Sequence, residues 1–314
     1  MMSGPPWVTA RVTANSMPKP TPNITDEIKR YLRTGDADMD ARAWPGDFIE
    51  RGRRQDADLR AALVEEVRRL AKGHTHELVP ANVGIELTRA KVEPMVRGFF
   101  ARAEQNVVLA TLEKSVVYVS SDTIESIILN HSWDRSRWDL ANMYLLSVGA
   151  KLLGKKAARI VGMSEETTCY VSPDYFAEGD PFADFIVHEA AHIFHNCKRR
   201  TIGLRETRTK EWLLDIEFRK RETFAYSCEA YARIVARARN PADRRALAAE
   251  YGAKRRISAE RVDPAEVASI VAEAASARNG WKVILARCAP TMKPRSALQL
   301  AREMIAEGRA PSST

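Results

Sequence analysis

Cysteine is scarce in this sequence of 314 residues. No two cysteines have the C-x-x-C spacing of a zinc ribbon or a redox pair; the four are Cys169, Cys197, Cys228 and Cys288. A disulfide framework is therefore not expected, and a chain of this length can bury an adequate core without one. We interpret the four side chains as reduced thiols.

Long apolar runs are also missing. No stretch approaches the roughly 18 apolar residues of a membrane-spanning helix. The first residues contain prolines where a secretory signal would need an apolar segment. Residues 1–23 are rich in Pro, Ser and Thr and predict a flexible tail. We expect no membrane partner and a cytoplasmic location.

Acidic residues are outnumbered by basic ones, and the formal net charge is +8. The basic residues gather in three segments, at 197–210, 219–221 and 254–262. These segments lack interleaved aromatics and contain no nucleic-acid motif. A solvated basic surface is therefore favoured over a nucleic-acid interface, although the charge leaves that second interpretation open.

Hydrophobic spacing predicts mostly helices, with a few short strands. Short β-branched segments indicate strands at 106–113, 115–121, 158–163 and 167–172. Helical spacing is found at 24–35, 56–73, 122–130, 136–153, 180–198, 210–240, 241–252, 264–278 and 294–307. The expected fold class is α+β and predominantly helical. Its expected divisions are a tail at 1–23, a helical N-terminal region at 24–104, a core at 105–240 and a helical C-terminal region at 241–314.

The predicted helix at 180–198 carries an H-E-x-x-H motif at residues 188–192. We expect Asp180 to be its N-cap and Pro181 its first residue. Positions i and i+4 lie on one helix face, so His188 and His192 can bind one metal ion. Glu189 lies about 100° further round the helix, beside the ion, where a general base is needed.

The residue types in this motif suit hydrolysis. Zinc lowers the pKa of its water toward ~7, and a neighbouring carboxylate takes the proton as the water attacks a carbonyl carbon. The carboxylate can then return that proton to the leaving amine. An accidental motif would half-bury two histidines and a glutamate without purpose, which is costly. The sequence therefore predicts one Zn²⁺ per chain, with Glu189 as the catalytic base.

The motif and its surroundings resemble the zincin superfamily of metallopeptidases, through V-H-E-A-A-H on a helix that follows a predicted edge strand at 167–172. The resemblance implies a zincin-like catalytic core with a small sheet, a motif helix and a glutamate helix. It also implies hydrolysis of a peptide bond in a protein or peptide substrate, which could dock on the edge strand by strand addition. It implies no particular substrate.

The third metal ligand separates the subclasses of this superfamily. Metzincins continue as H-E-x-x-H-x-x-G-x-x-H. Here the position of the glycine holds His195 and the position of the final histidine holds Lys198, which excludes that subclass. His195 is two turns, about 10 Å, from His188, too far to share one ion unaided. We expect it in the core or supporting a ligand. Gluzincin-like enzymes instead take a glutamate from a later helix, often within E-x-x-A.

The E-x-x-A pattern occurs twice, beginning at Glu222 and at Glu229. We predict Glu222 as the third ligand, because E-x-F-A followed by an aromatic most resembles the gluzincin-like glutamate helix. Glu229 would then fix the tautomer of a ligand histidine, or replace Glu222 as ligand. Tyr226 departs from the family pattern, in which an acid is common at that position. Tyr226 and Tyr231 are candidate donors to the oxyanion, with core packing as the alternative for each.

Two classes of function stay open on the sequence alone. The first is a zinc peptidase, or a hydrolase of another amide with the same site. The second is a basic nucleic-acid- or partner-binding regulator whose metal is structural. A structural site has four protein ligands, whereas a catalytic site keeps one position open for water. His195 or Cys228 as a fourth ligand would favour the regulator.

Overall fold

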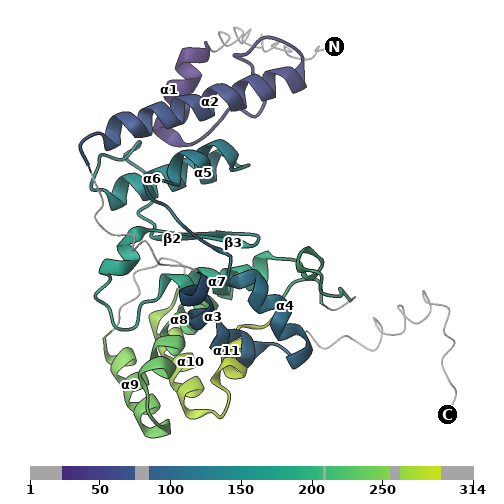
Figure 1. Ribbon diagram of the computed structural model, residues 1–314, viewed down its shortest axis with the longest axis vertical. Coiled ribbons are helices and arrows are strands. Elements are labelled where there is room, and N and C mark those ends of the chain that lie inside the picture. The colour runs from purple at the N-terminus through teal and green to yellow at the C-terminus, as the bar shows by residue number, and fades with distance from the viewer. Residues whose placement is uncertain (1–22, 75–84, 208–209, 255–261, 291–314) are drawn as a thin grey trace, which may run out of the picture.

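The computed structural model describes residues 23–74, 85–207, 210–254 and 262–290 (Figure 1). The predicted tail, apart from Asn23, and the predicted helix at 294–307 lie outside these residues. The α-helices are α1 (Ile24–Thr34), α2 (Phe48–Ala71), α3 (Ile85–Phe99), α4 (Arg102–Leu112), α5 (Ile124–Asn130), α6 (Asp134–Ser147), α7 (Phe185–Asn196), α8 (Arg221–Arg237), α9 (Pro241–Ala253), α10 (Pro264–Ser276) and α11 (Gly280–Cys288). The strands are β1 (Val116–Tyr118), β2 (Gly162–Glu165) and β3 (Thr168–Val171). The predicted class, mostly helical with a small sheet, is confirmed.

Local capping chemistry sets several helix boundaries. The Asn23 side chain accepts a hydrogen bond from the Thr25 amide at the start of α1, and Gly35, with a φ of 77°, ends that helix. Asn240 caps α9 in the same way, and Pro241 takes the first helical position. The helices predicted at 24–35 and 241–252 are therefore confirmed, as is α10 at its predicted place.

The sheet has the strand order β1-β3-β2. Strand β1 is parallel to β3, and β2 is antiparallel to it. The prediction that 167–172 forms an edge strand is wrong. Strand β3 is the central strand, because it pairs with β1 on one side and with β2 on the other. Strand β2 is the edge beside α7, and it begins at Gly162, later than the predicted strand at 158–163.

Two other predicted elements are wrong. Residues 106–112 belong to α4, with Glu113 as its C-cap, and do not form a strand. Val108, Leu109 and Leu112 are buried on one helical face, and packing overrides the β-propensity of valine. The helix predicted from 210 begins only at Arg221. Before it, the backbone amides of Leu213 and Leu214 bond to the carbonyl groups of Cys197 and Phe194 at the end of α7, so these amides are not available to an α-helix.

The hydrophobic residues form two main cores on either side of the sheet (Figure 1). One core joins α1, α2, α5 and α6. The other surrounds α7 and includes α3, α4, α8 and α11. The predicted boundary at 104–105 does not separate the two cores. Helix α3 lies before that boundary, yet α3 and α4 both pack in the core around the motif helix. Among the described residues, no helix is both long enough and apolar enough to cross a membrane.

Candidate metal centre

Helix α7 is fixed by its N-cap, which is Asp184 and not the predicted Asp180. The Asp184 side chain accepts from the Val187 amide, so the helix begins at Phe185. Asp184 is buried, and its carboxylate also pairs with Lys91 at 2.6 Å. Asp180 instead accepts from the Phe182 amide in the preceding turn. A buried, charge-paired cap of this kind holds the first turn of the motif helix in place.

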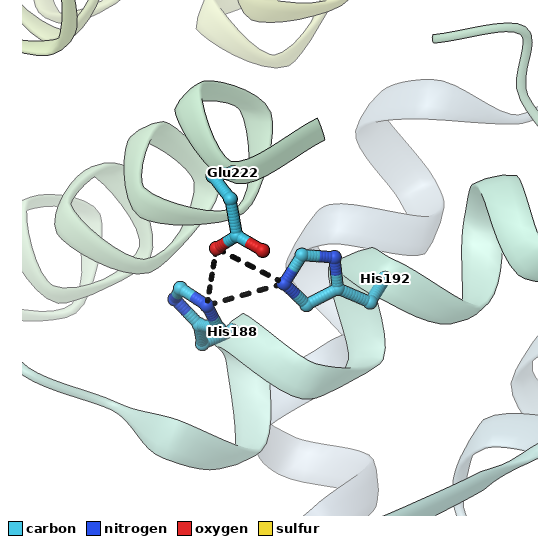
Figure 2. A group of neighbouring side chains, drawn as sticks. All are labelled: His188, His192 and Glu222. Carbon is cyan, nitrogen blue, oxygen red and sulfur yellow. Dashed lines mark hydrogen bonds and ion pairs between the residues drawn. The ribbon is translucent and has the colours of Figure 1, made fainter. Parts of the chain in front are cut away.

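The predicted ligand side chains converge on one point (Figure 2). His188 Nε2 and His192 Nε2 lie 3.2 Å apart on one face of α7. Glu222 Oε2, from α8, lies 3.7 Å from His188 Nε2 and 3.6 Å from His192 Nε2. Among the described residues, these three form the one group of histidine, cysteine or acidic side chains placed to hold a metal ion.

The size of this triangle fits zinc. A circle through three atoms with sides of 3.2, 3.6 and 3.7 Å has a radius of about 2.0 Å. Zinc lies about 2.0 to 2.2 Å from histidine nitrogens and carboxylate oxygens in proteins. One ion can therefore contact all three atoms without rearrangement of the side chains.

The outer nitrogen of His188 is held by Glu229. His188 Nδ1 lies 3.0 Å from Glu229 Oε2, and Glu229 Oε1 accepts from the Asp184 amide at 2.8 Å. An ionised carboxylate only accepts, so His188 Nδ1 must carry a proton. The lone pair of Nε2 is then directed at the centre. This is the tautomer-fixing role predicted for Glu229, and its geometry speaks against Glu229 as the ligand.

The outer nitrogen of His192 is held by a short relay. Asn196 Oδ1 lies 3.0 Å from His195 Nδ1, and His195 Nε2 lies 3.0 Å from His192 Nδ1. Because an amide oxygen only accepts, His195 is protonated on Nδ1 and accepts from His192 through Nε2. His192 Nε2 is then left with its lone pair. His195 thus touches a ligand without reaching the centre, as its spacing predicted.

The charge of these groups favours a cation at the centre. Burial disfavours a charged His188, but the carboxylates of Glu222 and Glu229 outweigh burial and raise the pKa of His188 to about 10, so the ring attracts a second proton at Nε2. A metal ion bound at Nε2 would replace that proton, because both need the same lone pair. The neighbouring His188 and His192 rings hold the pKa of Glu222 well below its usual range. Burial, together with the charges of His192 and Arg221, lowers the pKa of His195 to about 3, so its ring is neutral.

Glu189 lies beside the ligands, between α7 and the edge strand. Its side chain is buried, and burial raises the pKa of its carboxyl group against the charges of His188 and His192. Gly162, on the same strand, approaches so closely that a Cβ there would lie 2.7 Å from Glu189 Cγ. Strand β2 therefore fixes the position of the predicted general base.

The two tyrosines proposed as oxyanion donors differ in position. The Tyr226 ring packs edge-on against His188 with centroids 4.5 Å apart, and burial raises the pKa of its hydroxyl to about 12, so it stays a donor. Tyr231 is buried against Trp281 at 4.8 Å and is outside the site, so this prediction is wrong. Tyr231 comes nine residues after Glu222, which places the two side chains on opposite faces of α8.

A cavity of about 530 Å³ opens over the centre. It is lined by the three ligands, by Glu189 and Tyr226, and by groups that the sequence analysis did not single out: Gly162, Ser164, Asn196, Arg159 and Arg221. A glycine in a predicted strand signals a close approach by another group, and this signal could have identified Gly162. Asn196 and the arginines carry no comparable signal, because only the tertiary fold brings them together.

Neither predicted candidate supplies a fourth ligand among the described residues. His195 Nε2 is engaged with His192, and Cys228 is fully buried in the core. All four cysteines are free, as predicted, and all four are buried. Burial raises the pKa of Cys228 well above its usual value. The described residues therefore leave a coordination position open toward the cavity.

The chain was also compared with known proteins. No family model, curated protein or solved structure matches it.

Proposed function

We propose that this chain is a zinc-dependent peptidase with a zincin-like core, in which His188, His192 and Glu222 hold the ion and Glu189 is the general base. One observation carries the proposal. Three electron-pair donors, two of them in tautomers fixed by other side chains, converge with zinc-like spacing in an open cavity. The buried carboxylate of Glu189 lies beside them.

A zinc ion bound there would polarise a substrate carbonyl and lower the pKa of a coordinated water toward neutrality. Glu189 would take the proton of the attacking water, and its raised pKa makes it a better base than an exposed carboxylate. The same carboxyl group can then protonate the leaving amine. The close approach of Gly162 keeps it in one position through both transfers.

The cavity walls suit an extended peptide. Strand β2 is an edge strand, and its residues Gly162 and Ser164 line the cavity. A peptide backbone could therefore pair with β2, which replaces β3 as the surface for strand addition. Tyr226 lines the same cavity with a hydroxyl that stays protonated at neutral pH, and it is our candidate donor to the oxyanion.

The regulator with a structural metal is less well supported. A closed structural site needs a fourth protein ligand, and the described residues offer three. The placement of Glu189 would also have no purpose in such a site. Hydrolysis of another amide would use the same groups in the same way, and the substrate decides between that activity and peptide hydrolysis. The cytoplasmic location stays a prediction.

The test combines metal content with hydrolysis of a mixed peptide library. The wild type should hold about one zinc per chain, since its three ligands bind one ion. His192→Ala should lose the zinc and Glu189→Gln should retain it without activity. His74→Ala and Glu65→Gln, which change exposed residues away from the centre, are the matched controls. Wild-type protein that holds no zinc and cannot be reloaded would exclude the proposal.

A further inference from the structure

Two arginines line the cavity over the centre without an ion pair to any described residue. They are Arg159, in the segment before β2, and Arg221, the first residue of α8. Arginines elsewhere in the described chain commonly pair with carboxylates, as Arg30, Arg60 and Arg135 do. The cavity thus contains cationic groups that no described residue neutralises through an ion pair.

The carboxylates of the same cavity are engaged elsewhere. Glu222 faces the two ligand histidines, at 3.6 and 3.7 Å. Glu229 accepts from His188 on one oxygen and from a backbone amide on the other. Glu189 is buried against β2. None of the three forms an ion pair with Arg159 or Arg221 in the described structure, so these arginines can receive an anion from outside.

Arg221 is the better placed of the two. Its guanidinium carbon lies 5.1 Å from the centre of the Phe218 ring, a contact that steadies the side chain. Its Nε is buried and has no hydrogen-bond partner among the described residues. A buried N–H without a partner is costly, and a guanidinium pairs with a carboxylate through two parallel hydrogen bonds. The side chain therefore offers the donors that a carboxylate would satisfy.

We infer that Arg221, with Arg159 as a second cation, binds a carboxylate of the substrate beside the bond that is cleaved. The inference rests on the proposed peptidase function and narrows its substrate class. Preferred substrates would be peptides with a carboxylate close to that bond. The carboxylate belongs either to an acidic side chain or to a free C-terminus, because both present the same group to a guanidinium.

Hydrolysis tests the inference and separates the two sources. The cleaved bond is first located by mass spectrometry of a mixed peptide library. Four peptides built on that sequence then carry Glu or Gln beside the bond and a free or amidated C-terminus. The wild type should cleave the better carboxylate peptide about tenfold or more faster in kcat/KM than its neutral counterpart. A lower kcat/KM when Glu is replaced by Gln identifies the acidic side chain as the bound carboxylate. A lower kcat/KM when the peptide is amidated identifies the C-terminus.

Variants assign the preference to a residue. Arg221→Gln should remove the preference, so that the ratio of kcat/KM for the carboxylate peptide to kcat/KM for the neutral peptide falls to about one. Arg221→Lys, which keeps the charge, should retain part of the preference. Arg219→Gln is the matched control, because Arg219 is exposed and does not line the cavity. A wild type without the preference, or a preference that survives Arg221→Gln, overturns the inference.

Binding keeps this test separate from that of the peptidase. In Glu189→Gln, a fixed set of fluorescent peptides, with Glu or Gln at the centre and a free or amidated C-terminus, is titrated by anisotropy with Arg221 intact or replaced by Gln. This set is chosen without reference to any cleavage result. The carboxylate peptide should bind about tenfold more weakly without Arg221. If no peptide is cleaved by the wild type but this loss is seen, the peptidase fails and the anion site stands. If carboxylate and neutral peptides bind alike, or none binds, the anion site fails.

Discussion

Gly162 and Glu189 are in contact across the interface between β2 and α7. A Cβ at position 162 would lie 2.7 Å from Glu189 Cγ and 2.8 Å from its Cδ, distances that real Cβ atoms do not tolerate. The φ of Gly162 is not in the left-handed region, so the close approach, and not backbone strain, requires glycine there. The position of the proposed base therefore depends on the absence of a side chain one strand away.

Gly162→Ala should displace the Glu189 carboxylate and leave the three metal ligands in place. We expect kcat/KM to fall about 10- to 100-fold, because a shift of about 1 Å in a catalytic group can cost that much. Zinc content should be unchanged. Gly179→Ala is the control, since a Cβ there meets nothing within 4 Å. Full activity in Gly162→Ala would show that Glu189 is not confined by β2.

The spacing of the centre could be predicted because it is local. His188 and His192 are one turn apart on one helix, and the repeat of E-x-x-A placed Glu222 and Glu229 on one face of α8. The same periodicity could have excluded Tyr231, which lies on the opposite face of α8. Helical periodicity alone therefore accounts for most of the metal centre.

What could not be predicted depends on contacts between distant segments. The central place of β3 follows from its parallel pairing with β1, more than 50 residues earlier in the chain. Val107 and Val108 have strand propensity, yet α4 is helical because its buried face packs into the core around α7. The unpaired state of Arg221 likewise depends on the positions of all the acids around it.

Glu229→Gln should weaken the metal centre without removing a ligand. Its carboxylate fixes the proton on His188 Nδ1, and a glutamine can present an N–H there instead of an acceptor. We expect zinc affinity, measured by competition with a chromogenic chelator, to fall about 10- to 100-fold. Glu93→Gln, on the surface of α3, is the matched control. An unchanged affinity would mean that Glu229 does not set the tautomer.

The hydrogen bonds from His192 through His195 to Asn196 predict that zinc affinity depends on the side chain at position 196. Asn196→Leu removes the acceptor for His195 Nδ1, so the relay loses the group that orients both rings. We expect zinc affinity to fall about tenfold, the lower end for groups that support a ligand. Asn196→Asp keeps an acceptor and should restore most of the affinity. Equal losses in the two variants would show that the side chain acts through packing and not through its oxygen.

An ion pair between the buried Arg137 and the half-exposed Asp56 should contribute to stability without affecting the metal. Arg137 is fully buried on α6, where it pairs with Asp56 at 2.8 Å and also with Asp134. Burial disfavours the ionised form of Asp56, but hydrogen bonds from Arg60 and Arg137 outweigh it and lower the pKa of Asp56. Asp56 thus ionises more readily in the folded chain than in the unfolded one.

Asp56→Asn should lower the free energy of unfolding by about 1 kcal/mol at pH 7. It leaves the buried Arg137 with one carboxylate, but solvent screens the half-exposed Asp56 and reduces the loss. Since the folded-state pKa of Asp56 is below the unfolded value, its contribution is complete above that value and is lost as the pH falls through the folded-state pKa. The difference between wild type and variant, measured by urea unfolding, should therefore shrink below about pH 4. Asp40→Asn, which removes an exposed carboxylate 3.9 Å from Arg42, is the control and should change little. A loss that persists unchanged at low pH would have to come from packing and not from the charge of Asp56.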